Sequence, residues 1–190
     1  MNNKTLGLLA LTGAPFLLTG PLLEEIFKPV TGIGFYGAWA FVYITAWMCS
    51  MEALRRMEAT GRSRFGKNLL RIILVTLSLA NLSNIYALMA PENKSSVLFR
   101  VLDSFWPISN LIMLVVGITV IAAKGLPGWR RYVPLMAGLW FPMTLLAMIL
   151  AGRTSPLLVF VPWYSAIAWS LLAVAVLTSP EKRVYPVVAA

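Results

Sequence analysis

The sequence predicts an all-α, polytopic membrane protein, a six-transmembrane-helix bundle with both chain ends in the cytoplasm (N-in/C-in). Charged residues make up only 12% of the 190 residues, whereas apolar residues make up 59%. A soluble domain carries roughly twice that charged fraction, so a bilayer is the solvent that fits this composition. The charges are also confined to short segments between long uncharged stretches. These observations together predict membrane-spanning helices.

Six stretches are each long enough to cross a hydrocarbon core. An α-helix rises about 1.5 Å per residue, so about 20 residues span the roughly 30 Å of hydrocarbon. Backbone polar groups in lipid must be hydrogen-bonded within the segment, which favours helices over isolated strands. We expect a single transmembrane helical domain over residues 1–190, with spans near 6–23, 31–52, 70–91, 100–123, 132–152 and 156–178.

The first of these spans is the least regular. Lys4 followed by an apolar run resembles a secretory signal peptide, but no small-x-small cleavage site follows it. We therefore expect this segment to be retained as a true span. Its helix should be irregular because it contains Gly13, Pro15, Gly20 and Pro21.

The second and third spans carry aromatic or polar residues at helical spacing. Tyr36, Trp39 and Tyr43 form an aromatic stripe along the second span. Asn81 and Asn84, three residues apart, share one face of the third span. Polar groups inside a membrane are costly, and they usually face the interior of the bundle. These residues are therefore expected to face neighbouring helices.

The last three spans concentrate their polar residues near one end. Asp103, Trp106 and Asn110 follow i, i+3, i+7 spacing and share one face of the fourth span. The fifth span is uncharged throughout, and the N-terminal part of the sixth contains Trp163 and Tyr164. The opposite halves of the fourth and sixth spans are plain and apolar.

The distribution of Lys and Arg predicts the orientation. If the six spans alternate in direction, twelve of the sixteen Lys and Arg residues fall on the side of the N-terminus, and cytoplasmic loops carry such an excess. An even number of spans returns the C-terminus to the same side. We expect a plasma membrane location, or the inner membrane of a bacterium. The twelve residues are Lys4, Arg55, Arg56, Arg62, Arg64, Lys67, Arg71, Lys124, Arg130, Arg131, Lys182 and Arg183.

The high pI of about 10.1 follows from the same excess of basic residues. The densest basic run, 55–71, lies in and around a short loop between two spans. Attraction to anionic lipid headgroups accounts for it, so no nucleic-acid partner is expected.

In this orientation the polar and aromatic residues gather in the outer halves of the spans. We expect them to wall an outward-facing vestibule that binds or transports a small amphipathic molecule. Another interpretation stays open, in which the Trp and Tyr residues form interfacial belts and the Asn residues hydrogen-bond between helices. Asp103 would then lie beside Arg100 at the headgroups. The candidate ligand-binding residues are Tyr36, Trp39, Tyr43, Asn81, Asn84, Asp103, Trp106, Asn110, Trp163 and Tyr164.

Two further functions stay open. The chain is either an accessory or scaffold subunit of a larger membrane complex, with Gly117, Gly138 and Ala147 at flat helix contacts, or an enzyme that acts on a lipid or isoprenoid. The expected partners are the lipid bilayer, a small amphipathic ligand or lipid, and a second copy or another membrane subunit. The chain has no histidine, which excludes histidine-ligated haem or zinc and Ser-His or Cys-His catalytic pairs. No cofactor or metal is expected. Of the three interpretations, those without enzymatic activity are favoured.

Glu24 and Glu25, followed by Lys28, are superficially similar to the Glu-Glu motif of CAAX-type intramembrane proteases. That family also depends on histidines, which this chain lacks. We expect the pair to lie in an outer loop, with a cation or amine gate at the mouth of the vestibule as the functional alternative.

Overall fold

The structure is a computed structural model that describes residues 2–31 and 35–179, and it is all-α in this part of the chain. The described residues form seven α-helices and three short 3₁₀ turns. The α-helices are α1 (Asn3–Gly13), α2 (Phe16–Thr31), α3 (Tyr36–Arg56), α4 (Arg64–Met89), α5 (Val97–Ala123), α6 (Val133–Ala151) and α7 (Phe160–Leu177). The 3₁₀ turns are η1 (Pro91–Asn93), η2 (Gly128–Arg131) and η3 (Pro156–Val159).

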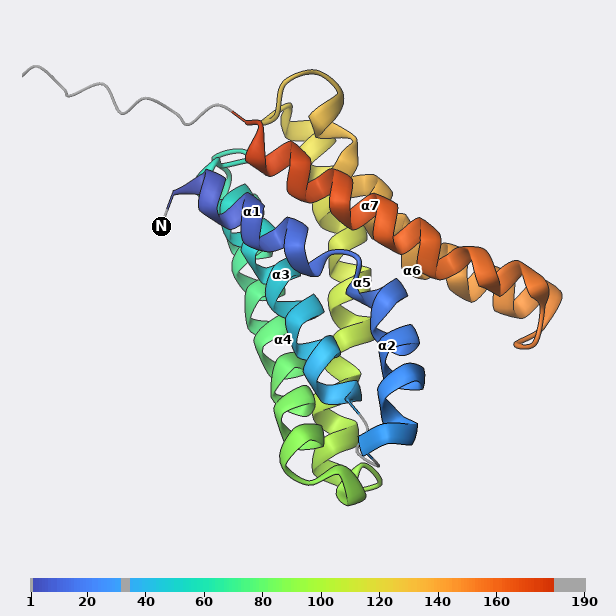
Figure 1. The fold of residues 1–190 in the computed structure, drawn as a ribbon. Coiled ribbons are helices and arrows are strands. Elements are labelled where there is room, and N and C mark those ends of the chain that lie inside the picture. Colours follow the sequence, from blue (N-terminus) through green and yellow to red (C-terminus); the bar gives the residue numbers. More distant parts are fainter. Residues whose placement is uncertain (1, 32–34, 180–190) are drawn as a thin grey trace, which may run out of the picture.

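The helices run up and down, and most helices that follow one another in the chain also pack together (Figure 1). Short loops force this antiparallel arrangement. α3, α4 and α5 stand side by side, and α6 and α7 lean away from them (Figure 1). The N-terminus, the α3–α4 loop and the end of α7 lie at one end of the molecule, which we call the α3–α4 end. The loop that contains η1 lies at the opposite end, the α4–α5 end.

Several helices are compatible with insertion into a membrane. Four helical segments among the described residues are long and apolar enough to cross one, namely Arg64–Met89, Val97–Ala123, Gly128–Ala151 and Phe160–Leu177. A fifth is added if the bent pair Asn3–Gly13 and Phe16–Phe27 counts as one span. α3 is 21 residues long but is not among these candidates, because its tyrosine and tryptophan residues lower its hydropathy. The count of six spans therefore stays a prediction.

The first expected span differs most from the sequence-based prediction. It was placed over 6–23 as one helix, whereas the structure has two helices that meet at 44°, and the second continues to Thr31. The break falls at Ala14 and Pro15, where proline has no N–H to donate to the preceding turn. The second expected span began at 31, and residues 32–34 lie outside the described residues.

The long helices turn polar side chains inward and apolar side chains outward. On α4, Asn84 is 2% exposed, while the neighbouring Leu82 is 48% exposed. On α5, Asn110 is buried and Leu111 is exposed. Exposed apolar faces of this length are typical of helices that contact lipid, and polar residues of such helices face the bundle interior.

α5 and α6 pack closely through small residues. A Cβ added to Gly117 would lie 2.4 Å from the Leu135 Cα, and one added to Gly138 would lie 2.7 Å from the Leu114 Cα. Glycine on both helices is therefore what allows the two backbones to approach. The contact lies inside the chain, so these two glycines are not available at a surface for a partner subunit.

Candidate functional site

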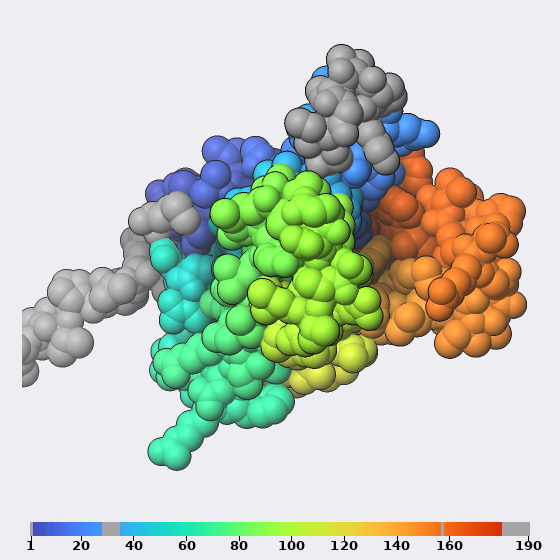
Figure 2. All heavy atoms as spheres, turned by 90° about the horizontal axis from the view of Figure 1, so that it is seen from below, coloured from blue at the N-terminus to red at the C-terminus, as the bar shows by residue number. Residues whose placement is uncertain are grey.

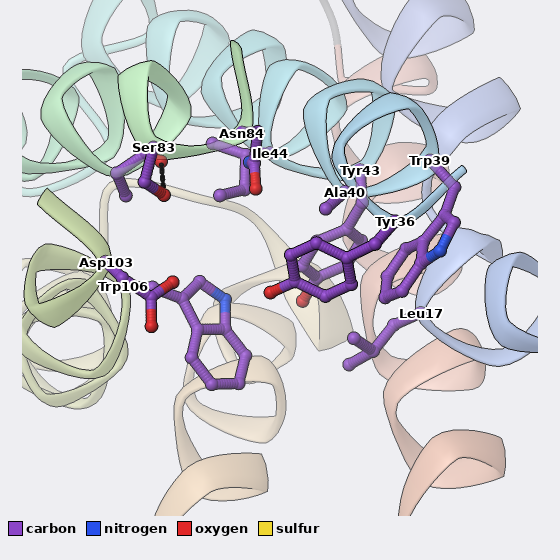
Figure 3. Close-up of a pocket in the computed structure, with 11 residues that line it drawn as sticks. Leu17, Tyr36, Trp39, Ala40, Tyr43, Ile44, Ser83, Asn84, Asp103 and Trp106 are labelled. Atoms are coloured by element: carbon purple, nitrogen blue, oxygen red, sulfur yellow. Dashed lines mark hydrogen bonds between the residues drawn. The ribbon is translucent and has the colours of Figure 1, made fainter. Parts of the chain in front are cut away.

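A cavity of about 210 Å³ lies between α2, α3, α4 and α5 (Figure 3). It is formed by the first turns of α3, the end of α4 and the beginning of α5, so it belongs to the α4–α5 end of the molecule, which Figure 2 shows from below. We call it the Asp103 pocket. Its lining residues are Leu17, Tyr36, Trp39, Ala40, Tyr43, Ile44, Ala80, Ser83, Asn84, Asp103 and Trp106.

The aromatic stripe of α3 forms one wall of the pocket. Tyr36 and Trp39 pack edge to face with 5.2 Å between ring centroids, and Tyr43 follows on the next turn. The Trp39 Nε1 donates a hydrogen bond of 3.0 Å to the Glu24 Oε2 on α2. A Cβ added to Gly20 would lie 2.4 Å from the Trp39 indole, so a glycine is what lets α2 approach this close. Trp39 is therefore held between α2 and α3 in one orientation.

The opposite wall carries a carboxylate. Asp103 is half-buried, and no other described residue forms a hydrogen bond or an ion pair with it. In Figure 3, Asp103 and Trp106 lie on one side of the pocket, and the Tyr36 hydroxyl points across the space toward them. Pro107, the next residue of α5, has no N–H to donate to the Asp103 backbone carbonyl four residues earlier. Asp103 is thus placed in the pocket and is not paired with Arg100.

The two asparagines of α4 have different roles. The Asn81 Nδ2 donates a hydrogen bond of 3.0 Å to the Thr45 Oγ1 on α3, which joins the two helices. The Asn84 Nδ2 donates to the Asn81 Oδ1 at 3.1 Å, and Asn84 itself lines the pocket. Asn110 is buried, but its Nδ2 donates to the Trp106 backbone carbonyl of its own helix. Asn81 therefore joins two helices and Asn110 bonds to the backbone of its own helix, and neither residue lines the cavity.

Tyr43 forms part of a buried group with unpaired polar atoms. Its side chain is only 2% exposed, and its hydroxyl makes no hydrogen bond with the rest of the described chain. The hydroxyl is directed toward that of Ser165 on α7, which is fully buried and also has no partner of proper geometry. The Nε1 atoms of Trp47 and Trp169, whose rings lie 4.4 Å apart, are unpaired too. Nearly all buried polar groups in proteins have a partner, so this group is unusual. Tyr43 is the member of the group that lines the Asp103 pocket.

The structure places the remaining predicted residues elsewhere. Trp163 is 56% exposed on the surface of α7, away from the Asp103 pocket. The Tyr164 hydroxyl donates to the Met136 backbone carbonyl at 2.8 Å. Tyr164 also lines a separate cavity of about 190 Å³ between α6 and α7, together with Thr144. Six of the ten predicted residues therefore line one pocket, and Asn81, Asn110, Trp163 and Tyr164 do not.

Two residues outside the ten candidates also lie close to the pocket, Glu24 and Lys94. The placement of Glu24 and Glu25 in an outer loop is wrong, because both lie within α2, where Glu24 is bonded to Trp39. Their alternative role as a gate stays a prediction. Lys94, from η1 and its flank, places its Nζ 4.9 Å from the centroid of the Tyr36 ring. The position of Glu24 directly after an apolar run was a usable signal for a carboxylate near the bundle. Nothing in the sequence connects Lys94 to Tyr36, because that contact joins separate helices.

The chain matches no family model, no curated protein and no solved structure. No relative therefore supplies a function or a set of site residues. The geometry of the Asp103 pocket is the basis for a functional conclusion.

Proposed function

We propose that this chain is a membrane protein that binds a small amphipathic molecule in the Asp103 pocket. The observation that carries the proposal is Tyr43, whose side chain lines a cavity walled by aromatic rings and whose buried hydroxyl lacks a hydrogen-bond partner within the described chain. A polar atom in a membrane interior must be satisfied by protein, trapped water or a ligand, because lipid tails offer no partner. The aromatic faces suit the apolar part of the ligand, and Asp103 and Asn84 suit its polar part.

The proposed topology has six spans with both ends in the cytoplasm. α1 and α2 together count as one span, and α3 counts as another despite its lower hydropathy. Its middle is surrounded by other helices, so its polar residues need not face lipid. The basic α3–α4 loop lies at the end opposite to the pocket, so the positive-inside rule makes the pocket open outward. Lys182 and Arg183, which contribute to the predicted bias, lie outside the described residues.

Binding is favoured over transport by the packing below the pocket. The gap around Tyr43, Trp47 and Trp169 has no room for a water molecule. Deeper still, Met51 and Leu54 are completely buried. A ligand in the pocket would be stopped at this aromatic layer, and transport would require Tyr43, Trp47 and Trp169 to separate.

The two alternatives receive less support. The scaffold interpretation placed Gly117, Gly138 and Ala147 at flat helix contacts, but Gly117 and Gly138 pack between α5 and α6 of the same chain. Ala147 lines the separate cavity between α6 and α7. The enzyme interpretation requires a pair of catalytic groups, but Glu24 is engaged by Trp39, which leaves Asp103 as the unengaged carboxylate of the described pocket wall.

A pocket-filling substitution tests the proposal. Ala40 lines the Asp103 pocket, and Ala147 lines the separate cavity between α6 and α7, so Ala40→Phe and Ala147→Phe are matched variants. The purified protein in maltoside micelles would be screened against amphiphiles with different head groups, with the shift in melting temperature as the readout. We expect Ala40→Phe to abolish the shift caused by at least one amphiphile, and Ala147→Phe to preserve it. If every shift survives Ala40→Phe in a variant that still melts cooperatively, the Asp103 pocket is not the binding site.

A further inference from the structure

The pocket has a charge arrangement that selects among amphiphiles. Three charged groups of the described chain lie around Tyr36. Asp103 lines the same pocket, Glu24 is bonded to the Trp39 indole that packs against the Tyr36 ring, and the Lys94 ammonium lies over that ring. Among the described residues that line the pocket, Asp103 is the one charged side chain, and its charge is negative. Asp103 lacks an ion-pair partner among the described residues, whereas Glu24 is engaged by Trp39. The charge complementary to this site is therefore positive.

The aromatic residues of the pocket favour the same kind of ligand. The faces of Trp and Tyr rings attract ammonium groups, and such contacts strengthen when water is excluded. Lys94 already makes one, since its Nζ lies 4.9 Å from the centroid of the Tyr36 ring. Trp39 and Trp106 place two more aromatic rings around the same space (Figure 3). A carboxylate among aromatic rings is an arrangement that suits an organic cation, whereas the Asp103 carboxylate would repel an anionic ligand.

A second, wholly apolar cavity lies next to the pocket. It has a volume of about 400 Å³ between α2 and α3, and we call it the α2–α3 groove. Apart from the indole nitrogen of Trp39, its lining side chains are hydrocarbon, and several of them, such as Leu23 and Phe27, are exposed on the surface of the bundle. Its lining residues are Phe16, Leu23, Phe27, Phe35, Ala38, Trp39 and Val42. In a membrane, such a groove is filled by a hydrocarbon chain.

Trp39 connects the two cavities because it lines both of them. Its indole is fixed by the hydrogen bond to Glu24 and by the close contact with Gly20. The indole therefore forms a partition between the pocket that holds Asp103 and Asn84 on one side and the apolar groove on the other. A molecule with a charged head and an aliphatic chain matches this division, with its head in the pocket and its chain in the groove.

We propose that the ligand is a cationic amphiphile, an aliphatic chain that carries a protonated amine or a quaternary ammonium group. The head binds between Asp103 and the rings of Tyr36, Trp39 and Trp106, and the chain lies in the α2–α3 groove. This inference rests on the proposed function and specifies the chemical class of its ligand. It also predicts that the ligand enters sideways from the lipid, past Trp39.

The test uses probes that share one chain and differ in the head group. Tetradecyltrimethylammonium, tetradecyl sulfate and tetradecyl maltoside are added to the full-length protein in maltoside micelles, and tetramethylammonium serves as a head without a chain. We expect the trimethylammonium probe to raise the melting temperature and the sulfate probe to leave it unchanged. Asp103→Asn keeps the shape of the side chain and removes its charge, and we expect it to weaken binding of the cationic probe about tenfold. Glu25→Gln is the matched control, because Glu25 lines neither cavity.

The groove is tested separately. Ala38→Leu narrows the groove without touching the pocket, so it should weaken binding of the tetradecyl probe and leave tetramethylammonium binding unchanged. A cationic probe with a diazirine at the end of its chain should label the peptides that contain Phe16–Phe27 and Phe35–Val42 in the unmodified protein. This labelling experiment does not depend on any variant folding.

The outcomes separate this inference from the proposed function. One outcome is that a neutral or anionic probe binds as tightly as the cationic probe, and that Ala40→Phe abolishes its binding while Asp103→Asn has no effect on it. The pocket then binds amphiphiles, but the inference that its ligand is cationic is wrong. If binding of the cationic probe depends on Asp103 but the diazirine labels peptides outside the α2–α3 groove, the pocket binds the head group as proposed. The proposed place of the aliphatic chain in the groove is then wrong. If no probe responds to Ala40→Phe, both this inference and the proposed function fail.

Discussion

Tyr43 combines deep burial with a hydroxyl that has no partner among the described residues. An unpaired buried polar group costs about 1–3 kcal/mol, because its desolvation is not compensated. The neighbouring asparagines show how the chain normally avoids this cost: the Asn81 Nδ2 is bonded to Thr45, and the Asn84 Nδ2 is bonded to Asn81. The different treatment of Tyr43 is explained if a ligand supplies its partner.

Tyr43→Phe should therefore change stability and binding in opposite directions. Removing the unpaired hydroxyl should raise the free energy of unfolding of the ligand-free protein by about 1 kcal/mol. This change corresponds to an increase of roughly 2–4 °C in the melting temperature. Loss of the hydrogen bond to the ligand should weaken binding about fivefold, which corresponds to about 1 kcal/mol. Thermal melting with and without the trimethylammonium probe measures both effects. A lower melting temperature of the ligand-free variant would show that the hydroxyl is already satisfied.

At the scale of the helices, the pocket depends on how α2 stands against α3. α2 is joined to α1 at a 44° bend, and it reaches α3 through the contact of Gly20 with Trp39. The Glu24 hydrogen bond adds a second connection one turn further along α2. The partition between pocket and groove is thus set by the distance between two helices.

Gly20→Ala should disturb that partition. The new Cβ would lie 2.4 Å from the Trp39 indole, so the ring must move and lose its hydrogen bond to Glu24. Overpacking of this kind costs about 1–3 kcal/mol. We expect a lower melting temperature and weaker binding of the cationic probe.

A second substitution distinguishes this clash from a general effect of alanine at position 20. Trp39→Phe removes one ring of the indole, so the double variant Gly20→Ala/Trp39→Phe should recover part of the lost melting temperature. Losses that simply add in the double variant would show that Gly20 and Trp39 are not coupled.

At the scale of the whole molecule, function depends on which side of the membrane the pocket faces. The pocket lies at the α4–α5 end, and the basic α3–α4 loop lies at the other end. Under the proposed topology, with Lys and Arg retained on the cytoplasmic side, the pocket would face outward. A ligand from the outer leaflet would reach it without crossing the membrane.

Cysteine labelling checks this orientation. Cys49 is the single cysteine of the chain, so Cys49→Ser gives a background free of thiols. In intact cells, a membrane-impermeant maleimide should label Asn93→Cys at the α4–α5 end, and it should label Arg62→Cys in the α3–α4 loop only after the cells are opened. Both positions are exposed, so accessibility within the protein does not limit the reaction. The reverse pattern would place the pocket on the cytoplasmic side.

Much of the candidate site was predictable because helical spacing is a local property. Tyr36, Trp39 and Tyr43 line one wall of the pocket at the spacing that the sequence indicated. Trp106 and Trp163 show the limit of this reasoning. Both are tryptophans near the ends of apolar helices, but Trp106 lines the pocket and Trp163 is exposed. Their difference depends on the rotation and tilt of each helix, which spacing does not specify.

The sequence by itself determined the all-α class, the apolar character of the helices and the faces on which their polar residues lie. Backbone hydrogen bonds within a helix join residues four apart, so these properties follow from short stretches of sequence. The sequence indicated an irregular first span, but not the 44° angle between its two helices. The tertiary structure alone decided the placement of Glu24 against Trp39 and the contact of Asn81 with Thr45, 36 residues away. These features depend on close packing between helices, in which the size of one residue such as Gly20 fixes the position of another.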